Sequence, residues 1–264
     1  MRAFFLLLLV PLAMWVTQSL TLVGAGLPIR VRIDPVKTPP HLRRNLRVSL
    51  HATFVAVLAL YPLVRGRSPL AYYLSYFPLG SRPGEFVWGV AAAILYLAAL
   101  YLAWLAAGVI RFGRERDRMS LALRLVRALL SAVLLALVEE MVFRSMLLAD
   151  LLLSFDGHPW AAIAMGTAIF STAHYVRRVT RHWVIFGQIA VGLLFSVAFF
   201  TTQALWLPVG LHAGGILFVR GLRSLTRSDG PHWLVGESAF PFAGVPGIVA
   251  ALLLAFNVFR TYGP

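Results

Sequence analysis

Long apolar runs separated by short polar segments dominate the chain. A run of about 17 to 25 apolar residues is long enough to cross about 30 Å of hydrocarbon as a helix. Eight runs of this kind are predicted to span a membrane, at 3–24, 48–64, 86–110, 121–152, 159–176, 183–200, 204–219 and 242–259. The first run reaches Val23 with no small-residue cleavage site before the following basic loop, which favours a retained helix over a signal peptide. The pattern predicts an all-α fold, a polytopic membrane helical bundle of about eight transmembrane helices.

The composition supports this class and excludes others. Of 264 residues, 59% are hydrophobic and 13% are charged, which is too apolar for a soluble domain. Cysteine is absent, so disulfides and thiolate metal sites are excluded. No repeat or soluble segment interrupts the pattern, which predicts one integral membrane domain over 1–264.

The net charge of +14 comes mainly from arginines in short clusters between the apolar runs. Such flanking clusters predict membrane lipids as partners and no nucleic acid. Sixteen Lys and Arg residues fall on the odd-numbered loops and five on the other side, so the positive-inside rule predicts cytoplasmic odd loops and both termini outside.

Two acids stand near the middle of the fourth predicted span. Ionisable side chains at this depth cost roughly 2.5–3.5 kcal/mol each, which makes them candidates for a functional site. Glu140 and Arg144 are four residues apart and share a helix face, so we expect them to form a charge-assisted pair. Glu139 is turned by about 100° from Glu140 and is left available as a general base on a water molecule. The alternative is that both acids form interhelical ion pairs that only hold the bundle together.

Two histidines complete the constellation. His174 ends the fifth predicted span and His212 lies in the seventh, where Gly210, Gly214 and Gly215 allow another helix to approach closely. His174 is predicted to lie at a shallower depth than Glu139. A site that holds both therefore requires a water-filled cavity open to the cytoplasm, or a local shift of the fifth span.

These residues resemble those of a known family. Glu139 to Arg144 fits the pattern EExxxR, Phe170 to His174 fits FxxxH, and His212 follows in a third segment. The order and spacing are similar to those of the CPBP family, which comprises type II CAAX prenyl endopeptidases and the bacteriocin-processing or immunity proteins also called Abi proteins. The resemblance covers about residues 120–220 as a catalytic core.

The resemblance implies a role for each matching residue. Glu139 matches the glutamate that activates the hydrolytic water, and His174 matches the histidine that assists it. Glu140 and Arg144 match the supporting pair, and His212 matches a histidine that helps to stabilise the oxyanion. The implied location is an integral membrane protein of the bacterial cytoplasmic membrane, with the active site open to the cytoplasm.

The chain departs from the family pattern at one position, in the third motif. The third motif usually continues to Asn or Asp four residues after the histidine, where this chain has Ile216. Asn257 is the possible substitute for this oxyanion donor within a predicted span.

No HExxH motif is present, but Glu139, His174 and His212 are a plausible zinc set. We favour a metal-free mechanism, because the pairing of Glu140 with Arg144 leaves Glu139 as a base without an ion.

The leading hypothesis is an intramembrane endopeptidase that hydrolyses peptide bonds of membrane-associated or lipidated substrates with glutamate-activated water. The alternative is a catalytically silent CPBP-like membrane partner or immunity factor, which Ile216 favours. A proton-coupled transporter is a third hypothesis, disfavoured because no repeat or paired broken helices are visible.

Overall fold

The computed structural model describes residues 2–29, 39–80, 82–113, 121–177, 184–222, 225–236 and 241–263. Within these ranges the chain forms two compact units, Met1–Tyr73 and Leu74–Pro264. The prediction of one domain over 1–264 stays a prediction. Most of the basic loops used to predict orientation, at 30–38, 114–120 and 178–183, lie outside the described residues.

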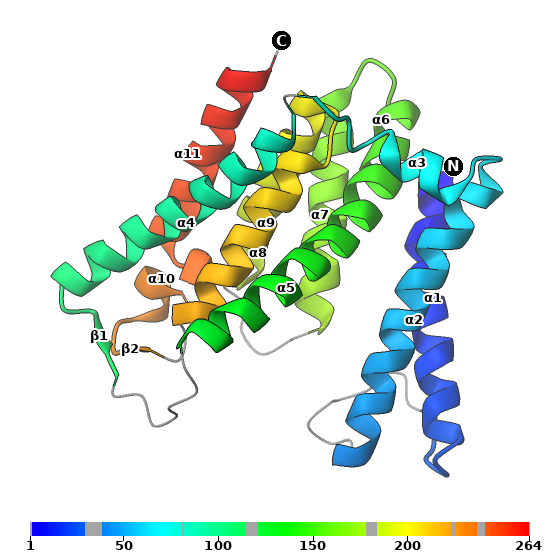
Figure 1. Ribbon diagram of the computed structural model, residues 1–264, viewed down its shortest axis with the longest axis horizontal. Coiled ribbons are helices and arrows are strands. Elements are labelled where there is room, and N and C mark those ends of the chain that lie inside the picture. Colours follow the sequence, from blue (N-terminus) through cyan, green and yellow to red (C-terminus); the bar gives the residue numbers. More distant parts are fainter. Residues whose placement is uncertain are drawn as a thin grey trace. The chain divides into compact units, whose positions relative to one another are not determined.

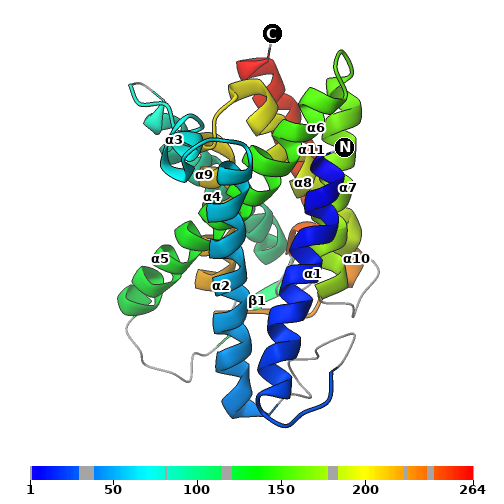
Figure 2. The same cartoon turned by 90° about the vertical axis from the view of Figure 1, so that its right-hand side faces the viewer.

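The first unit is a helical hairpin. Its elements are α1 (Arg2–Val23), α2 (Pro40–Val64) and the start of α3 (Pro69–Leu74). The helices α1 and α2 run side by side in both views (Figure 1, Figure 2). A hydrogen bond of 2.8 Å between the hydroxyls of Thr17 and Thr53 joins them.

The second unit contains the segment with the candidate catalytic residues. Its elements are α4 (Pro83–Ala106), β1 (Ile110–Phe112), α5 (Leu121–Glu140), the π-helix η1 (Met141–Leu148), α6 (Ala149–Ser154), α7 (Pro159–Arg177), α8 (Val184–Thr202), α9 (Trp206–Leu222), β2 (Thr226–Ser228), α10 (His232–Val235), the 3-10 helix η2 (Pro241–Ala243) and α11 (Val245–Tyr262). Helices α4 and α7 begin at a proline, whose fixed φ suits the first turn of a helix.

The all-α prediction is confirmed, and each of the eight predicted spans coincides with a helical segment. By length and composition, four helices in the described part of the chain are long and apolar enough to cross a membrane: His41–Val64, Pro83–Ala106, Val184–Thr202 and Val245–Tyr262. The number of eight crossings therefore stays a prediction.

Three local features differ from the expected spans. The third span was expected to reach residue 110, but α4 ends at Ala106 and Gly108 turns the chain with φ +67°. Strand β1 follows and pairs antiparallel with β2, with Arg111 opposite Arg227. The fourth span is continuous to Ser154, but its second half contains the π-helix η1, which the sequence pattern does not indicate.

Helix α9 lies between α4 and α5 within this unit (Figure 1). Two of its glycines, Gly210 and Gly214, face α4: a Cβ atom on Gly214 would lie 2.6 Å from the carbonyl oxygen of Val90. A Cβ on Gly89 of α4 would lie 2.8 Å from the carbonyl oxygen of Leu207. These glycines let the two backbones touch, as in small-residue interfaces of membrane helices. They do not face the acids on α5, so they determine where α9 stands and bring His212 to the site only indirectly.

The opposite face of α9 packs on α5 through small side chains. Ala128, Ala132 and Ala136 are buried at four-residue intervals and are in line with Glu140 on the same face of α5. Near the other end of this contact, Arg220 donates a hydrogen bond of 2.5 Å to the hydroxyl of Ser131. The alanine face allows α9 to approach closely, so that His212 reaches Glu140.

Candidate active site

The acid pair stands where α5 changes into the π-helix η1. Glu139 and Glu140 are the last two residues of α5, and Arg144 lies inside η1. All three are buried, with exposed fractions of 8%, 0% and 1% respectively. Single π turns within longer helices occur frequently at functional sites, because the wider turn changes the direction of the side chains.

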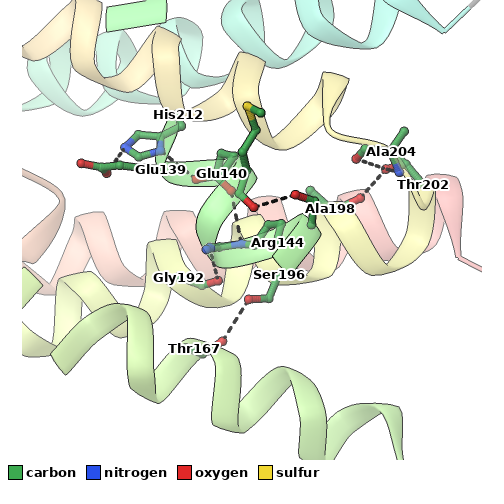
Figure 3. A network of polar contacts seen from close by, with 12 residues as sticks. Glu139, Glu140, Arg144, Thr167, Gly192, Ser196, Ala198, Thr202, Ala204 and His212 are labelled. Atoms are coloured by element: carbon green, nitrogen blue, oxygen red, sulfur yellow. Dashed lines mark hydrogen bonds and ion pairs between the residues drawn. The ribbon is translucent and has the colours of Figure 1, made fainter. Parts of the chain in front are cut away.

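Glu140 holds two groups in place (Figure 3). Its Oε2 lies 3.2 Å from Nε of Arg144, an ion pair whose angle is not that of an aligned hydrogen bond. Its Oε1 lies 2.8 Å from Nδ1 of His212. Both carboxylate oxygens are therefore engaged, and we assign Glu140 to positioning His212.

Arg144 completes this arrangement from the other side. Its Nη2 donates a hydrogen bond of 3.3 Å to the carbonyl oxygen of Gly192 on α8. Its guanidinium carbon lies 4.7 Å from the ring centre of Phe170 and 5.7 Å from that of Phe195. The carboxylate, the carbonyl and the two rings together replace the water that a buried guanidinium loses.

Glu139 faces both histidines. Its Oε2 lies 3.2 Å from Nε2 of His174 and 3.6 Å from Nε2 of His212. The expected difference in depth between His174 and Glu139 does not keep them apart, because α7 continues to Arg177 and carries His174 against η1. One carboxylate oxygen and two imidazole nitrogens thus meet at one point.

The hydrogen bonds on the far side of each ring indicate the tautomers. Nδ1 of His174 lies 2.8 Å from the carbonyl oxygen of Phe170, which only accepts, so this nitrogen carries a proton. Nδ1 of His212 faces the ion-paired carboxylate of Glu140 and carries a proton for the same reason. When the rings are neutral, both Nε2 atoms are acceptors that face an acceptor oxygen of Glu139. The point where they meet therefore favours a shared proton or a water molecule that donates to them.

Aromatic rings hold the two imidazoles in these orientations. Phe195 of α8 stacks on His212 with centroids 4.8 Å apart and planes at 23°. Phe170 packs on His174 with centroids 4.2 Å apart. Gly192 and Phe195, whose helix α8 carries none of the predicted residues, were missed by the sequence analysis. A glycine and an aromatic residue three positions apart in an apolar helix were too weak a signal to find them.

The structure brings together the five residues predicted from the motifs but not the proposed substitute donor. Glu139, Glu140, Arg144, His174 and His212 form one connected cluster. Asn257, by contrast, is exposed on α11, outside this buried cluster. Ile216 lies one turn after His212 on α9 and is partly buried. The side chain at position 216 therefore offers no donor to the site.

The side chains of the proposed zinc set lie next to one another. Over the described ranges, however, no group of three or more His, Cys, Asp or Glu side chains is arranged to hold a metal ion. Each imidazole uses its Nδ1 in a hydrogen bond and directs its Nε2 at Glu139, an orientation that metal-bound histidines share. We derive no step through a metal.

The comparisons with known proteins agree with the motif. Residues 121–217 match the family described as Type II CAAX prenyl endopeptidase Rce1-like. The matched segment runs from α5 to α9 and contains all five clustered residues. No curated protein and no solved structure matches the chain. The family match and the apolar helices together identify an integral membrane protein.

Proposed function

We propose that this chain, which belongs through residues 121–217 to the CPBP family of type II CAAX prenyl endopeptidases, is an intramembrane endopeptidase. The observation that carries the proposal is the meeting of Glu139 with His174 and His212, at 3.2 and 3.6 Å, inside a buried cluster. A carboxylate held beside two imidazoles is suited to removing a proton from water and returning it later.

In the proposed reaction Glu139 is the general base. It takes a proton from a water molecule held between Glu139 and His174, and the water oxygen bonds to the carbonyl carbon of the substrate. The C–N bond then breaks, and the proton passes from Glu139 to the leaving amine. His174 accepts a hydrogen bond from the water through its Nε2. His212, fixed by Glu140, is protonated on both ring nitrogens in the reacting form and donates from Nε2 to the charge that develops on the carbonyl oxygen.

The surroundings favour substrates that are themselves held by a membrane. The site is carried by apolar helices of an integral membrane protein, so the proposed substrates are lipidated peptides or the ends of membrane helices. We also propose that the protein resides in the bacterial cytoplasmic membrane with its site open to the cytoplasm. The basic loops next to the predicted spans support this orientation.

The test is cleavage of a library of lipidated and unlipidated peptides by the protein in lipid nanodiscs, followed by mass spectrometry. We expect cleavage by the unaltered protein and a fall in kcat of about 10² to 10⁴ in Glu139→Gln. The matched control is Glu85→Gln, an acid of α4 that pairs with Arg82 outside the cluster. Equal activity of Glu139→Gln and the unaltered protein would refute the assignment of the base.

One observation favours a second candidate, a catalytically silent membrane partner or immunity factor. Ile216 places a hydrocarbon side chain where the family motif has a polar donor. Loss of one oxyanion donor costs other enzymes about 10² to 10³ in kcat. Absence of cleavage by a folded sample, with cleavage gained in Ile216→Asn, would favour this candidate.

A further inference from the structure

A buried amide lies on the side of α8 that faces the cluster. Gln188 is only 4% exposed, in a helix that is otherwise nearly all apolar. Burying an amide in such a helix is costly unless it gains a partner. Gln188 has no role in the proposed reaction.

The helix spacing shows which way Gln188 faces. Residues 188, 192 and 195 follow the spacing i, i+4, i+7, which places them on one face of a helix. The carbonyl oxygen of Gly192 accepts from Arg144, and the ring of Phe195 stacks on His212. Gln188 therefore belongs to the face of α8 that contacts the cluster.

The packing of α8 on α7 shows which residue of α7 lies level with Gln188. The two helices are antiparallel, with the hydroxyls of Ser196 and Thr167 3.4 Å apart. A Cβ atom on Gly192 would lie 2.9 Å from Cδ1 of Phe170. Four residues back from Gly192 on α8 corresponds to about four residues forward from Phe170 on α7. Gln188 thus lies level with His174, about 6 Å along the helix axis from Gly192.

An amide at this level adds a donor to the one that the cluster offers, Nε2 of the protonated His212. Charge that develops on a carbonyl oxygen needs hydrogen-bond donors directed at it. The guanidinium of Arg144 is engaged by Glu140 and Gly192, and Ile216 has no polar atom. The NH₂ group of a glutamine is neutral and offers two donors, so it can serve an anion without adding a charge to the bilayer.

We propose that the side-chain amide of Gln188 donates a hydrogen bond to the carbonyl oxygen of the substrate, as a second oxyanion donor beside His212. The inference rests on the proposed function, since it assigns a role in that reaction. It identifies a residue outside the three motifs and accounts for the tolerance of isoleucine at position 216.

The experiment compares Gln188→Leu with Ser196→Ala in nanodiscs. Ser196 is a buried polar residue of the same helix that faces Thr167 instead of the cluster (Figure 3). We expect kcat to fall about 10²-fold in Gln188→Leu, with KM within about threefold, and to stay within about threefold in Ser196→Ala. We expect Ile216→Asn to restore at least tenfold of the loss when added to Gln188→Leu, because it supplies an amide from the neighbouring helix.

Binding of a peptide phosphinate, a stable tetrahedral anion, provides a readout that does not need turnover. We expect Gln188→Leu to weaken phosphinate binding at least tenfold while binding of the parent peptide changes little. Unchanged kcat and unchanged phosphinate affinity in a folded Gln188→Leu sample would overturn the inference and leave the proposed function intact. If the unaltered protein cleaves nothing, the proposed function fails, and the phosphinate comparison alone decides whether Gln188 is a donor.

Discussion

Replacing Arg144 by methionine tests whether the buried charges depend on one another. Arg144→Met keeps a long apolar side chain between Phe170 and Phe195 but leaves the carboxylate of Glu140 without its ion-pair partner. Glu140 has no exposed surface, and removing one partner of a buried pair costs about 3–5 kcal/mol. Nδ1 of His212 still donates to Glu140, so we expect a loss near the lower limit, about 3 kcal/mol.

The assay is the free energy of unfolding, measured by SDS titration in mixed micelles for a double-mutant cycle. We expect Arg144→Met with Glu140→Gln to be more stable than Arg144→Met alone by about 1–3 kcal/mol, because no unpaired charge remains. Arg111→Met is the control: Arg111 pairs with Asp229 but its side chain is 75% exposed, so its loss should cost about 1 kcal/mol or less. A cost below about 1 kcal/mol for Arg144→Met, or additive effects in the double variant, would refute the reasoning.

Three further outcomes follow from the packing and the donor set. Gly214→Ala should destabilise the protein by about 1–3 kcal/mol, since its Cβ would lie 2.6 Å from the carbonyl oxygen of Val90, whereas Gly215→Ala, with open space around its Cβ, should change the unfolding free energy by less than about 1 kcal/mol. Phe195→Leu should lower kcat about tenfold, because the ring that stacks on His212 is lost, and should change the free energy of unfolding proportionately less. An unaltered kcat would show that the stacking does not orient the imidazole. Peptide cleavage should survive a chelator, and a loss that zinc alone restores would show that a metal is needed.

The sequence predicted the helices and the pair of Glu140 with Arg144 because both depend on local spacing. A separation of four residues in a helix predicts the pair of Glu140 with Arg144, and in the structure Oε2 of Glu140 lies 3.2 Å from Nε of Arg144. The contacts of His174 and His212 with the acids could be expected only from the resemblance to a family, since they join helices far apart in the chain. Three features depend on how helices pack, which hydropathy does not encode: the π-helix η1, the contacts of Gly192 and Phe195 with the cluster, and the exposed position of Asn257.

Two adjacent glutamates of the same chemistry are given different tasks by the turn of one helix. Glu140 faces Arg144 and Nδ1 of His212, so its charge is used to fix other groups. Glu139 faces the Nε2 atoms of His174 and His212, where neutral rings leave only acceptors and a proton or water must stand between them. Substitutions should therefore have separable effects: Glu140→Gln should disturb stability and the orientation of His212 together. Glu139→Gln should stop turnover in a protein that unfolds like the unaltered one. Equal losses of stability in both, together with unchanged turnover in Glu139→Gln, would mean that the cluster only holds the helices together and that neither acid acts as a base.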